Sequence, residues 1–365
     1  MAKRKLKSIA VMTGGGDCPG LNAVIRAVTK TAINQHGLTV WGIQDGYLGL
    51  IENRIVPLTY QDTSNILTLG GTILGSSNTS DPFRFPVQVG EKVQIKDVSK
   101  QCLTRLYERG IEALVCIGGD GTMASAAKFT KLGLPVIGVP KTIDNDLVGT
   151  DVTFGFDTAV TTATEAIDKI HTTASSHHRV MIIEVMGRYA GWIALYAGAA
   201  SGADVILIPE IPYELDKVCQ YVVRRSQRGK RFSIIVVSEG AKPHGGQMVV
   251  LKRIATSPDP IRLGGIANKL AEDINAQTAL DCRAVVLGHV QRGGTPTPHD
   301  RTLATMFGHH ALELLADGVK NRLVVWKDGA LSSVPLSSVA GKTKLVPRHH
   351  KLIQAAKAIG ASFGA

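Results

Sequence analysis

Two carboxylates stand close together in a loop whose residues could carry out phosphoryl transfer. Asp144 and Asp146 follow Pro140-Lys141-Thr142 at the end of an apolar run. Phosphoryl transfer needs a base near the attacking hydroxyl and positive charge against the phosphoryl oxygens, and this loop contains both. Asp-Asn-Asp segments also occur in ordinary turns. The position directly after Pro-Lys-Thr favours the catalytic interpretation.

A glycine-rich loop at residues 14–20 follows the first apolar run and precedes a segment with helical spacing. Backbone N–H groups and the positive end of a helix dipole favour an anion at such a place. The loop fits the dinucleotide fingerprint poorly, because its third glycine comes one residue late. A Walker sequence is also absent, since Leu336 stands where Gly341-Lys342-Thr343 needs a leading glycine. A phosphate site and a purely structural turn both stay open for this loop.

A second glycine-rich sequence, GGDGT at residues 118–122, ends another apolar run. A carboxylate among glycines at the end of a strand can bind Mg²⁺ while neighbouring N–H groups bind phosphate oxygens. The same sequence could instead be a capped turn before a helix over residues 124–129. Asp120 is therefore a candidate magnesium ligand, and Asp146 is a second one.

Short apolar runs alternate along the chain with segments of helical period, which is typical of parallel βα units. The runs are rich in Val and Ile and show little polar alternation, as expected for strands covered on both faces. Helical spacing is clearest for Leu21, Val24, Ile25 and Val28. The expected strands cover residues 8–12, 38–43, 111–117, 134–139, 180–185, 204–208, 232–237 and 283–287, and further helices cover 162–170 and 263–274.

The composition is that of a globular protein, with 44% hydrophobic and 19% charged residues in 365. The formal charge of +11 raises the possibility of nucleic-acid binding, but the basic residues are dispersed and aromatic residues make up only 5%. No apolar run reaches the length of a membrane span, and no signal-peptide pattern is visible. The five scattered cysteines form no CxxC pair and fit reduced thiols. We expect a cytoplasmic protein with no nucleic-acid partner and no membrane association.

The three loops and four later motifs resemble the phosphofructokinase family. The later motifs are MGRYAGW at 186–192, PEIP at 209–212, SEG at 238–240 and GHVQRGG at 288–294. They occur in family order, from about Ser8 to beyond Arg301. The resemblance implies a Mg²⁺-dependent glycolytic enzyme that phosphorylates the 1-hydroxyl of fructose 6-phosphate with ATP, giving fructose 1,6-bisphosphate. It also implies a homo-oligomer, a tetramer.

The resemblance implies an α/β fold with two Rossmann-like parallel-sheet domains and an active site in the cleft between them. The length of the chain allows two domains. We expect the chain to cross between them within residues 141–153 and near 291–297, where Gly and Pro cluster. The expected donor-binding domain covers 1–150 and about 292–340. The expected domain for fructose 6-phosphate covers 151–291 and about 341–365.

The resemblance also implies a role for each motif residue. Asp144 matches the base that removes the proton from the sugar hydroxyl, and Thr142 matches the hydroxyl that contacts the transferring phosphoryl group. Asp120 and Asp146 match magnesium ligands. The implied residues are Lys141, Thr142, Asp144 and Arg188 for catalysis; Thr142, Asp144, Arg179, Met186, Gly187, Arg188, Glu239, Arg283, His289 and Arg292 for the sugar phosphate; and Gly16, Arg84, Gly119, Asp120, Gly121 and Thr122 for the nucleotide.

Arginine side chains suit a sugar phosphate, because a guanidinium group can donate two hydrogen bonds to one phosphate. Arg179 and Arg283 resemble the arginines that reach into a neighbouring subunit's site. Arg84 is assigned the role of an arginine that simple bacterial enzymes place soon after Leu-Gly-Ser. His289 could be an ordinary histidine at a strand end, but the Gln-Arg-Gly-Gly sequence close behind it favours phosphate binding.

Two positions bear on the phosphoryl donor, and they disagree. Gly121 leaves room for the inner phosphate of a nucleotide, where relatives that use pyrophosphate typically carry aspartate. Lys141 stands where those relatives carry lysine and the best-known bacterial ATP enzymes carry glycine. The combination resembles a mixed-type branch of ATP users, so we expect ATP, with pyrophosphate as the alternative.

Two further alternatives belong to other functional classes. A non-catalytic regulatory subunit would have no physical need for the candidate base Asp144, nor for Asp120 and Arg188. A nicotinamide oxidoreductase would explain the first glycine loop but would leave residues 141–146 and 289–294 without a purpose. Both alternatives explain fewer motifs than phosphoryl transfer does.

The resemblance implies an effector site between subunits, in which Asp204 would hold a metal ion. Tyr60 and His171 stand where members of the family carry arginines, so we expect altered effector chemistry. The basic residues implied for this site are Arg26, Lys30, Lys230 and Arg231.

Overall fold

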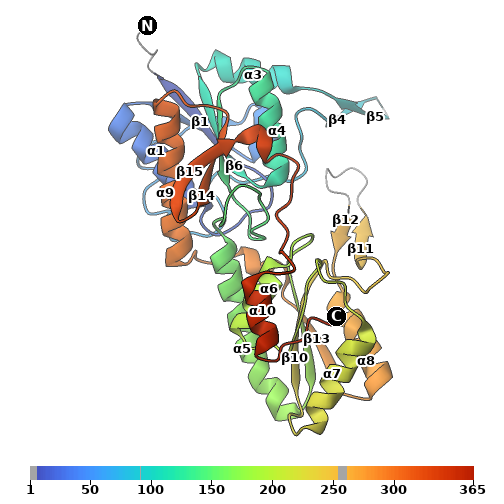
Figure 1. The fold of residues 1–365 in the computed structure, drawn as a ribbon. Coiled ribbons are helices and arrows are strands. Elements are labelled where there is room, and N and C mark those ends of the chain that lie inside the picture. The colour runs from blue at the N-terminus through green and yellow to red at the C-terminus, as the bar shows by residue number, and fades with distance from the viewer. Residues whose placement is uncertain (1–5, 91, 254–260) are drawn as a thin grey trace.

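The computed structural model describes residues 6–90, 92–253 and 261–365 and consists of two α/β bodies (Figure 1). One body contains the N-terminus and the other contains the C-terminus. The expected fold class is confirmed, because each body has a largely parallel sheet with helices around it. Among the described residues, no helix is both long enough and apolar enough to cross a membrane.

The N-terminal body is built on a sheet of seven strands. The five central strands run parallel, and the strand at each edge pairs antiparallel to its neighbour. The order is β15 (Ala330–Pro335), β14 (Arg322–Lys327), β7 (Val136–Pro140), β6 (Ala113–Gly118), β1 (Ser8–Thr13), β2 (Thr39–Ile43) and β3 (Ile55–Pro57). The two strands at one end of the sheet, β15 and β14, come from late in the sequence.

Helices cover both faces of this sheet, which explains why β1 and β6 are largely apolar and are buried at every position. Alternate side chains of β1 point to opposite faces. Ile9 and Val11 join the core beneath one pair of helices, whereas Ala10 and Met12 join the core beneath the others. The first pair is α1 (Leu21–His36) and α9 (Pro298–Ala316), and the others are α2 (Gly46–Glu52), α3 (Ser99–Glu108) and α4 (Asp120–Lys131).

The C-terminal body is built on four parallel strands in the order β13 (Cys282–Val286), β8 (Val180–Val185), β10 (Ser233–Ser238) and β9 (Val205–Leu207). This sheet is also covered on both faces. Residues Met181 and Ile183 of β8 face one layer, and Val180 and Ile182 face the other. The layers are α5 (Phe156–His177), α6 (Trp192–Ala200) and α10 (Lys351–Ala358) on one side, and α7 (Leu215–Gln227) and α8 (Ile266–Thr278) on the other.

Two antiparallel hairpins project from the bodies on the same side of the molecule (Figure 1). One consists of β4 (Phe85–Val89) and β5 (Lys92–Lys96), and the other of β11 (Val250–Arg253) and β12 (Ile261–Leu263). The sequence analysis anticipated neither hairpin, nor β14 and β15. The helix expected from residue 263 begins at Ile266 instead, because Gly264 and Gly265 adopt positive φ angles of 141° and 89°.

The chain passes between the bodies after β7, again before α9, and finally after β15. The last passage runs from β15 to α10, after which Ser362 forms a bridge with Val205 of β9. These passages lie close to the expected boundaries, and the assignment of a donor domain and a sugar-phosphate domain stays a prediction.

The contact between α1 and α9 depends on a glycine. A Cβ added to Gly308 would lie 2.8 Å from the Val24 carbonyl oxygen and 2.9 Å from the Ala27 Cβ, too close for backbone atoms that cannot move aside. We predict that Gly308→Ala lowers the free energy of unfolding by about 1–3 kcal/mol through overpacking. Thermal unfolding followed by circular dichroism measures the change.

The control for this substitution is Thr302→Ala, on an exposed position of the same helix. Its melting temperature should stay close to that of the wild type. Equal melting temperatures for the Gly308 and Thr302 variants would contradict the packing argument.

Candidate active site

Three loops meet at the carboxyl ends of the neighbouring strands β1, β6 and β7. Gly14 N–H donates to the Ile117 carbonyl oxygen (2.9 Å), and Lys141 N–H donates to the Gly118 carbonyl oxygen (2.9 Å). Within the GGDGT sequence, Gly118 ends β6, Gly119 is the N-cap and the last three residues form the first turn of α4, which begins at Asp120 and not at residue 124. The first N–H groups of α4 therefore lie beside the other loops, where they can bind an anion.

The glycines of these loops differ in what surrounds them. A Cβ on Gly14 would lie 2.8 Å from Thr122 Oγ1, and one on Gly16 would lie 2.7 Å from an Arg292 guanidinium nitrogen. A side chain at Gly14 would collide with the branched Thr122 side chain, and one at Gly16 would displace the Arg292 guanidinium group. A Cβ on Gly121 would have no atom within 4 Å, so the space beside this residue is open. The open side of Gly121 can admit a ligand.

Two cationic side chains connect the loops. Lys141 is only 4% exposed, and its Nζ donates to the Gly16 carbonyl oxygen. Burial lowers the pKa of Lys141 from its ordinary value, and the nearby Arg292 charge lowers it further. Arg292 donates from Nη1 to the Asp17 carbonyl oxygen at 3.2 Å. Two basic groups, the Lys141 amine and the Arg292 guanidinium, therefore lie beside the first glycine loop.

The carboxylate pair occupies the same region. The pKa of Asp144 is raised to about 7, chiefly by burial and also by the Asp146 charge, against the Arg292 charge that lowers it. Asp144 Oδ1 is buried and has no hydrogen-bond partner among the described residues. Burial also raises the pKa of Asp146, against a hydrogen bond from the Thr142 hydroxyl that lowers it. A buried carboxylate oxygen without a partner requires an explanation, and a ligand hydroxyl would supply one.

Asp120 is the third carboxylate. Burial raises the pKa of Asp120, and the Asp146 charge acts in the same direction. A hydrogen bond from the Gly341 N–H lowers this pKa. The Gly341 N–H donates to Asp120 Oδ1 at 2.7 Å. No three His, Cys, Asp or Glu side chains cluster at metal-binding spacing within the described ranges. Mg²⁺ is usually bound by one or two carboxylates together with phosphate and water oxygens, so Asp120 and Asp146 fit this ion.

The C-terminal body contributes groups from the carboxyl ends of β8 and β10. Glu239 N–H donates to the Val185 carbonyl oxygen at 2.9 Å, so Glu239 and Met186 follow adjacent strand ends. Burial raises the pKa of Glu239, and the charges of Arg188 and Arg292 lower it. The Glu239 charge in turn raises the pKa of Asp144.

Packing around Gly187 fixes the backbone of this region. Gly187 has a φ of 129°, and a Cβ on it would lie 2.6 Å from Ser238 Oγ. Met186 N–H donates to Gln291 Oε1 at 3.3 Å, which holds the first residue of the MGRYAGW motif beside the GHVQRGG motif. The structure thus brings together Gly16, Gly119, Asp120, Gly121, Thr122, Lys141, Thr142, Asp144, Asp146, Met186, Gly187, Arg188, Glu239 and Arg292.

Arg179 and Arg283 lie apart from this group. Arg179 precedes β8 and Arg283 is the second residue of β13, so both lie at the opposite end of the sheet from Met186. Arg179 Nε bonds Asp281 Oδ2 at 2.7 Å, and Arg283 Nη1 bonds Asp281 Oδ1 at 2.8 Å. Arg283 lies on the edge strand β13 and Arg179 directly before the inner strand β8, so their shared partner Asp281 keeps both guanidinium groups at the amino end of this sheet.

Two other residues that the sequence analysis assigned to the site, His289 and Arg84, have exposed side chains. His289 lies in the short 3₁₀ helix Gly288–Arg292. Arg84 follows a turn in which its N–H donates to the Asp81 carbonyl oxygen at 3.0 Å, next to the β4–β5 hairpin. Their assigned roles in binding the sugar phosphate and the nucleotide stay predictions.

The sequence analysis missed Lys344, which donates three hydrogen bonds beside the carboxylate loop. Its Nζ lies 3.0 Å from Asn145 Oδ1 and 3.0 Å from each of the carbonyl oxygens of Thr150 and Asp151. These partners precede Lys344 by more than 190 residues. No local pattern around Lys344 could have indicated the contact.

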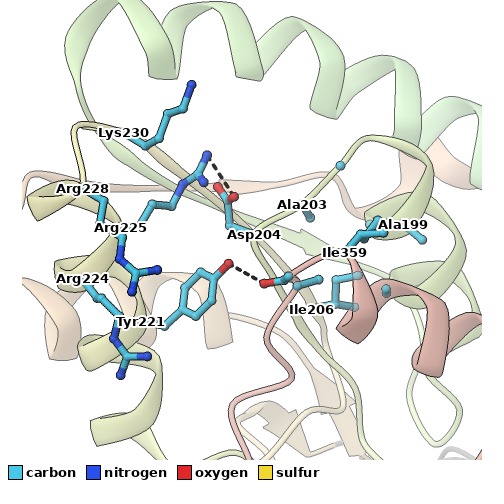
Figure 2. A pocket seen from close by; sticks show the side chains of 15 residues that line it. Ala199, Ala203, Asp204, Ile206, Tyr221, Arg224, Arg225, Arg228, Lys230 and Ile359 are labelled. Carbon is cyan, nitrogen blue, oxygen red and sulfur yellow. Dashed lines mark hydrogen bonds and ion pairs between the residues drawn. The ribbon is translucent and has the colours of Figure 1, made fainter.

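A separate cavity of about 380 Å³ lies at the amino end of β9, between α7 and the end of the chain (Figure 2). Asp204 bonds Arg225 at 3.0 Å and accepts from the Ile234 N–H at 2.9 Å. The Arg225 guanidinium group thus already pairs with Asp204, where the sequence analysis expected a metal ion. Lys230 lines the cavity but extends away from Asp204 in Figure 2. An effector role for this cavity stays a prediction.

Residues 8–315 match the family described as Phosphofructokinase. The chain is 53% identical over 360 residues to a Clostridium perfringens protein named ATP-dependent 6-phosphofructokinase 2, with 98% of each chain covered. It is 50% identical over 340 residues to a pyrophosphate–fructose 6-phosphate 1-phosphotransferase of Amycolatopsis mediterranei, covering 93% of this chain and 96% of that protein. The crystal structure of Pichia pastoris phosphofructokinase in the T-state matches with a TM-score of 0.78 and 30% identity, covering 98% of this chain and 36% of that longer chain. The chain therefore belongs to the phosphofructokinase family.

Proposed function

We infer that the chain is an ATP-dependent 6-phosphofructokinase, which transfers a phosphoryl group from ATP to the 1-hydroxyl of fructose 6-phosphate. The observation that carries this inference is the buried, unpartnered Oδ1 of Asp144, which lies between the glycine loops of one body and the Glu239–Arg188 group of the other. Relatives of nearly the same length carry the name of this activity.

Asp144 is the general base in this reaction. The unpartnered oxygen of Asp144 accepts the proton of the sugar 1-hydroxyl while the hydroxyl oxygen attacks the phosphoryl group. The pKa of about 7 suits a base that must take up a proton near neutral pH. Glu239 and the arginines Arg188 and Arg292 hold the sugar phosphate, and thereby bring its 1-hydroxyl to Asp144.

The N-terminal body provides the groups that bind the phosphoryl donor. The N–H groups at the start of α4 and the cation of Lys141 stabilise negative charge on the donor phosphates. Mg²⁺, when bound by Asp120 and Asp146, neutralises charge on the phosphoryl oxygens. Thr142 Oγ1 accepts from the Asp144 N–H at 3.1 Å, which keeps the hydroxyl beside the base.

The position of Arg179 and Arg283 at the amino end of the second sheet supports a homo-oligomer. Each arginine is paired with Asp281 and lies at the opposite end of this sheet from Met186, which belongs to the site of its own chain. The arginines of one copy complete the sugar-phosphate site of a neighbouring copy, in a tetramer.

The open space beside Gly121 gives a prediction about the phosphoryl donor. The wild type should turn over Mg-ATP and show little activity with pyrophosphate. Gly121→Asp should raise KM for ATP and lower kcat/KM by about ten- to a hundredfold, because a carboxylate there repels the inner phosphates. A coupled assay with both donors measures these changes.

Gly121→Ala is the matched control, since a methyl group at this position meets no atom within 4 Å. It should keep most of the ATP-dependent rate. Strong pyrophosphate-driven turnover by the wild type, without ATP activity, would overturn the choice of donor.

Replacing the base tests the reaction itself. Asp144→Asn should lower kcat by about 10²- to 10⁴-fold, because the amide cannot take the proton of the attacking hydroxyl. The affinity for fructose 6-phosphate, measured by calorimetry, should change little, because Glu239 and the arginines remain. Unaltered turnover by this variant would show that another group is the base.

The raised pKa of Asp144 predicts the pH dependence of the reaction. The carboxyl group is protonated below its pKa, so kcat/KM for fructose 6-phosphate should fall as the pH is lowered through about 7. The residual activity of Asp144→Asn should lack this decrease. An identical profile for both proteins would assign the titration to the substrate phosphate or to another residue.

A further inference from the structure

The C-terminal passage between the two bodies runs directly over the carboxylate loop. We define residues 341–346 as the strap. Gly341 N–H donates to Asp120 Oδ1 at 2.7 Å, and Lys344 N–H donates to the Asp146 carbonyl oxygen at 2.6 Å. Thr343 forms an antiparallel bridge with Leu147. The strap therefore contacts the carboxylate of Asp120 and the backbone of Asp146, the two residues that we assign to magnesium.

The Lys344 side chain makes the strongest contact of the strap with the loop. Its ammonium group has three protons and three acceptors within 3.0 Å, namely Asn145 Oδ1 and the carbonyl oxygens of Thr150 and Asp151. Asn145 is the residue between the two aspartates and adopts a left-handed φ of 48°. Holding Asn145 in this conformation determines how Asp144 and Asp146 are directed relative to each other.

The other side of the strap is held by the C-terminal body. Trp192 Nε1 donates to the Lys344 carbonyl oxygen at 2.9 Å. Glu210 Oε1 accepts from the Val346 N–H at 2.8 Å and from the Gly191 N–H at 3.1 Å. The strap is thus bonded to the end of the MGRYAGW motif, which also contains Arg188, and to the PEIP motif, for which the reaction itself provides no role.

We propose that Lys344 is a positioning residue, which holds the Asp144–Asp146 loop in its reactive conformation and connects it to the sugar-phosphate motif through Trp192 and Glu210. The proposal rests on the proposed function, because the loop it positions is the one that carries the base. A lysine suits this place, because an ammonium group on a long stem carries three N–H donors that can be directed to three separate oxygens.

Lys344→Met tests the proposal, because methionine keeps most of the stem and removes the three donors. We expect kcat with Mg-ATP and fructose 6-phosphate to fall by about 10- to 100-fold, as misplacement of reacting groups by about 1 Å does. KM for both substrates should change by less than about threefold, because the binding groups remain. Amide exchange of residues 142–151, measured by mass spectrometry, should become faster.

Two variants separate this role from a general loss of stability. Lys344→Arg keeps the charge and several donors, and it should recover a substantial part of kcat. Lys351→Met removes an exposed lysine on the first turn of α10, and it should behave as the wild type in all three measurements. If Lys344→Met does not fold, Lys344→Gln, which still donates two hydrogen bonds, is used for the same comparison.

The outcomes are distinguishable from those that test the function. A wild type without activity would overturn the proposed function, whatever the variants do. An active wild type with normal kcat and normal amide exchange in Lys344→Met would overturn the positioning role alone. A loss of affinity for fructose 6-phosphate with unchanged kcat would overturn it as well, because it would place Lys344 in substrate binding.

Discussion

The structure depends on the burial of three carboxylates beside two cations at the point where two sheets end. Burial is the largest cause that raises the pKa of Asp120, Asp144 and Asp146, and the Asp146 charge adds to this effect at the other two. Lys141 and Arg292 oppose the repulsion, and burial of Lys141 lowers its own pKa in return. Removing one partner from such a group leaves an uncompensated buried charge, which is strongly destabilising. The surrounding fold therefore has to hold all five groups in place together.

Parallel sheets provide that support, because their loops gather at one edge and the backbone of each strand is fixed by its neighbours. Gly14 and Gly16 allow the first loop to approach Thr122 and Arg292 more closely than any side chain would permit. Gly121 has the opposite role, since the space beside it is open. Glycines in one site thus serve both to pack the protein against itself and to leave room for a donor.

Much of the fold and of this site could be predicted because the information is local. The strands β1, β6, β7 and β8 can be recognised from their apolar composition. The motif residues that follow them lie at the carboxyl ends of the parallel strands of each sheet. The start of α4 at Asp120 was missed because glycines beside Asp120 disfavour a helix locally, while the anion site favours one. The strand β14 was missed because its pairing with β7 joins segments nearly 190 residues apart, and β15 was missed with it because β15 pairs with β14. The three acceptors of Lys344 were missed for the same reason.

The distant contacts are also those that join the two bodies, and this has a consequence for how the site works. Arg292 follows the second sheet but bonds the Asp17 carbonyl oxygen of the first, and it acts on the charges of both Asp144 and Glu239. The strap makes the second connection, from Asp120 and Asp146 to Trp192 and Glu210. Phosphoryl transfer tolerates little misplacement of the reacting atoms, so the proposed function requires the two bodies to keep a fixed distance. Local sequence can specify each half of the site, whereas Arg292 and residues of the C-terminal tail that contain no catalytic motif help to hold the halves together.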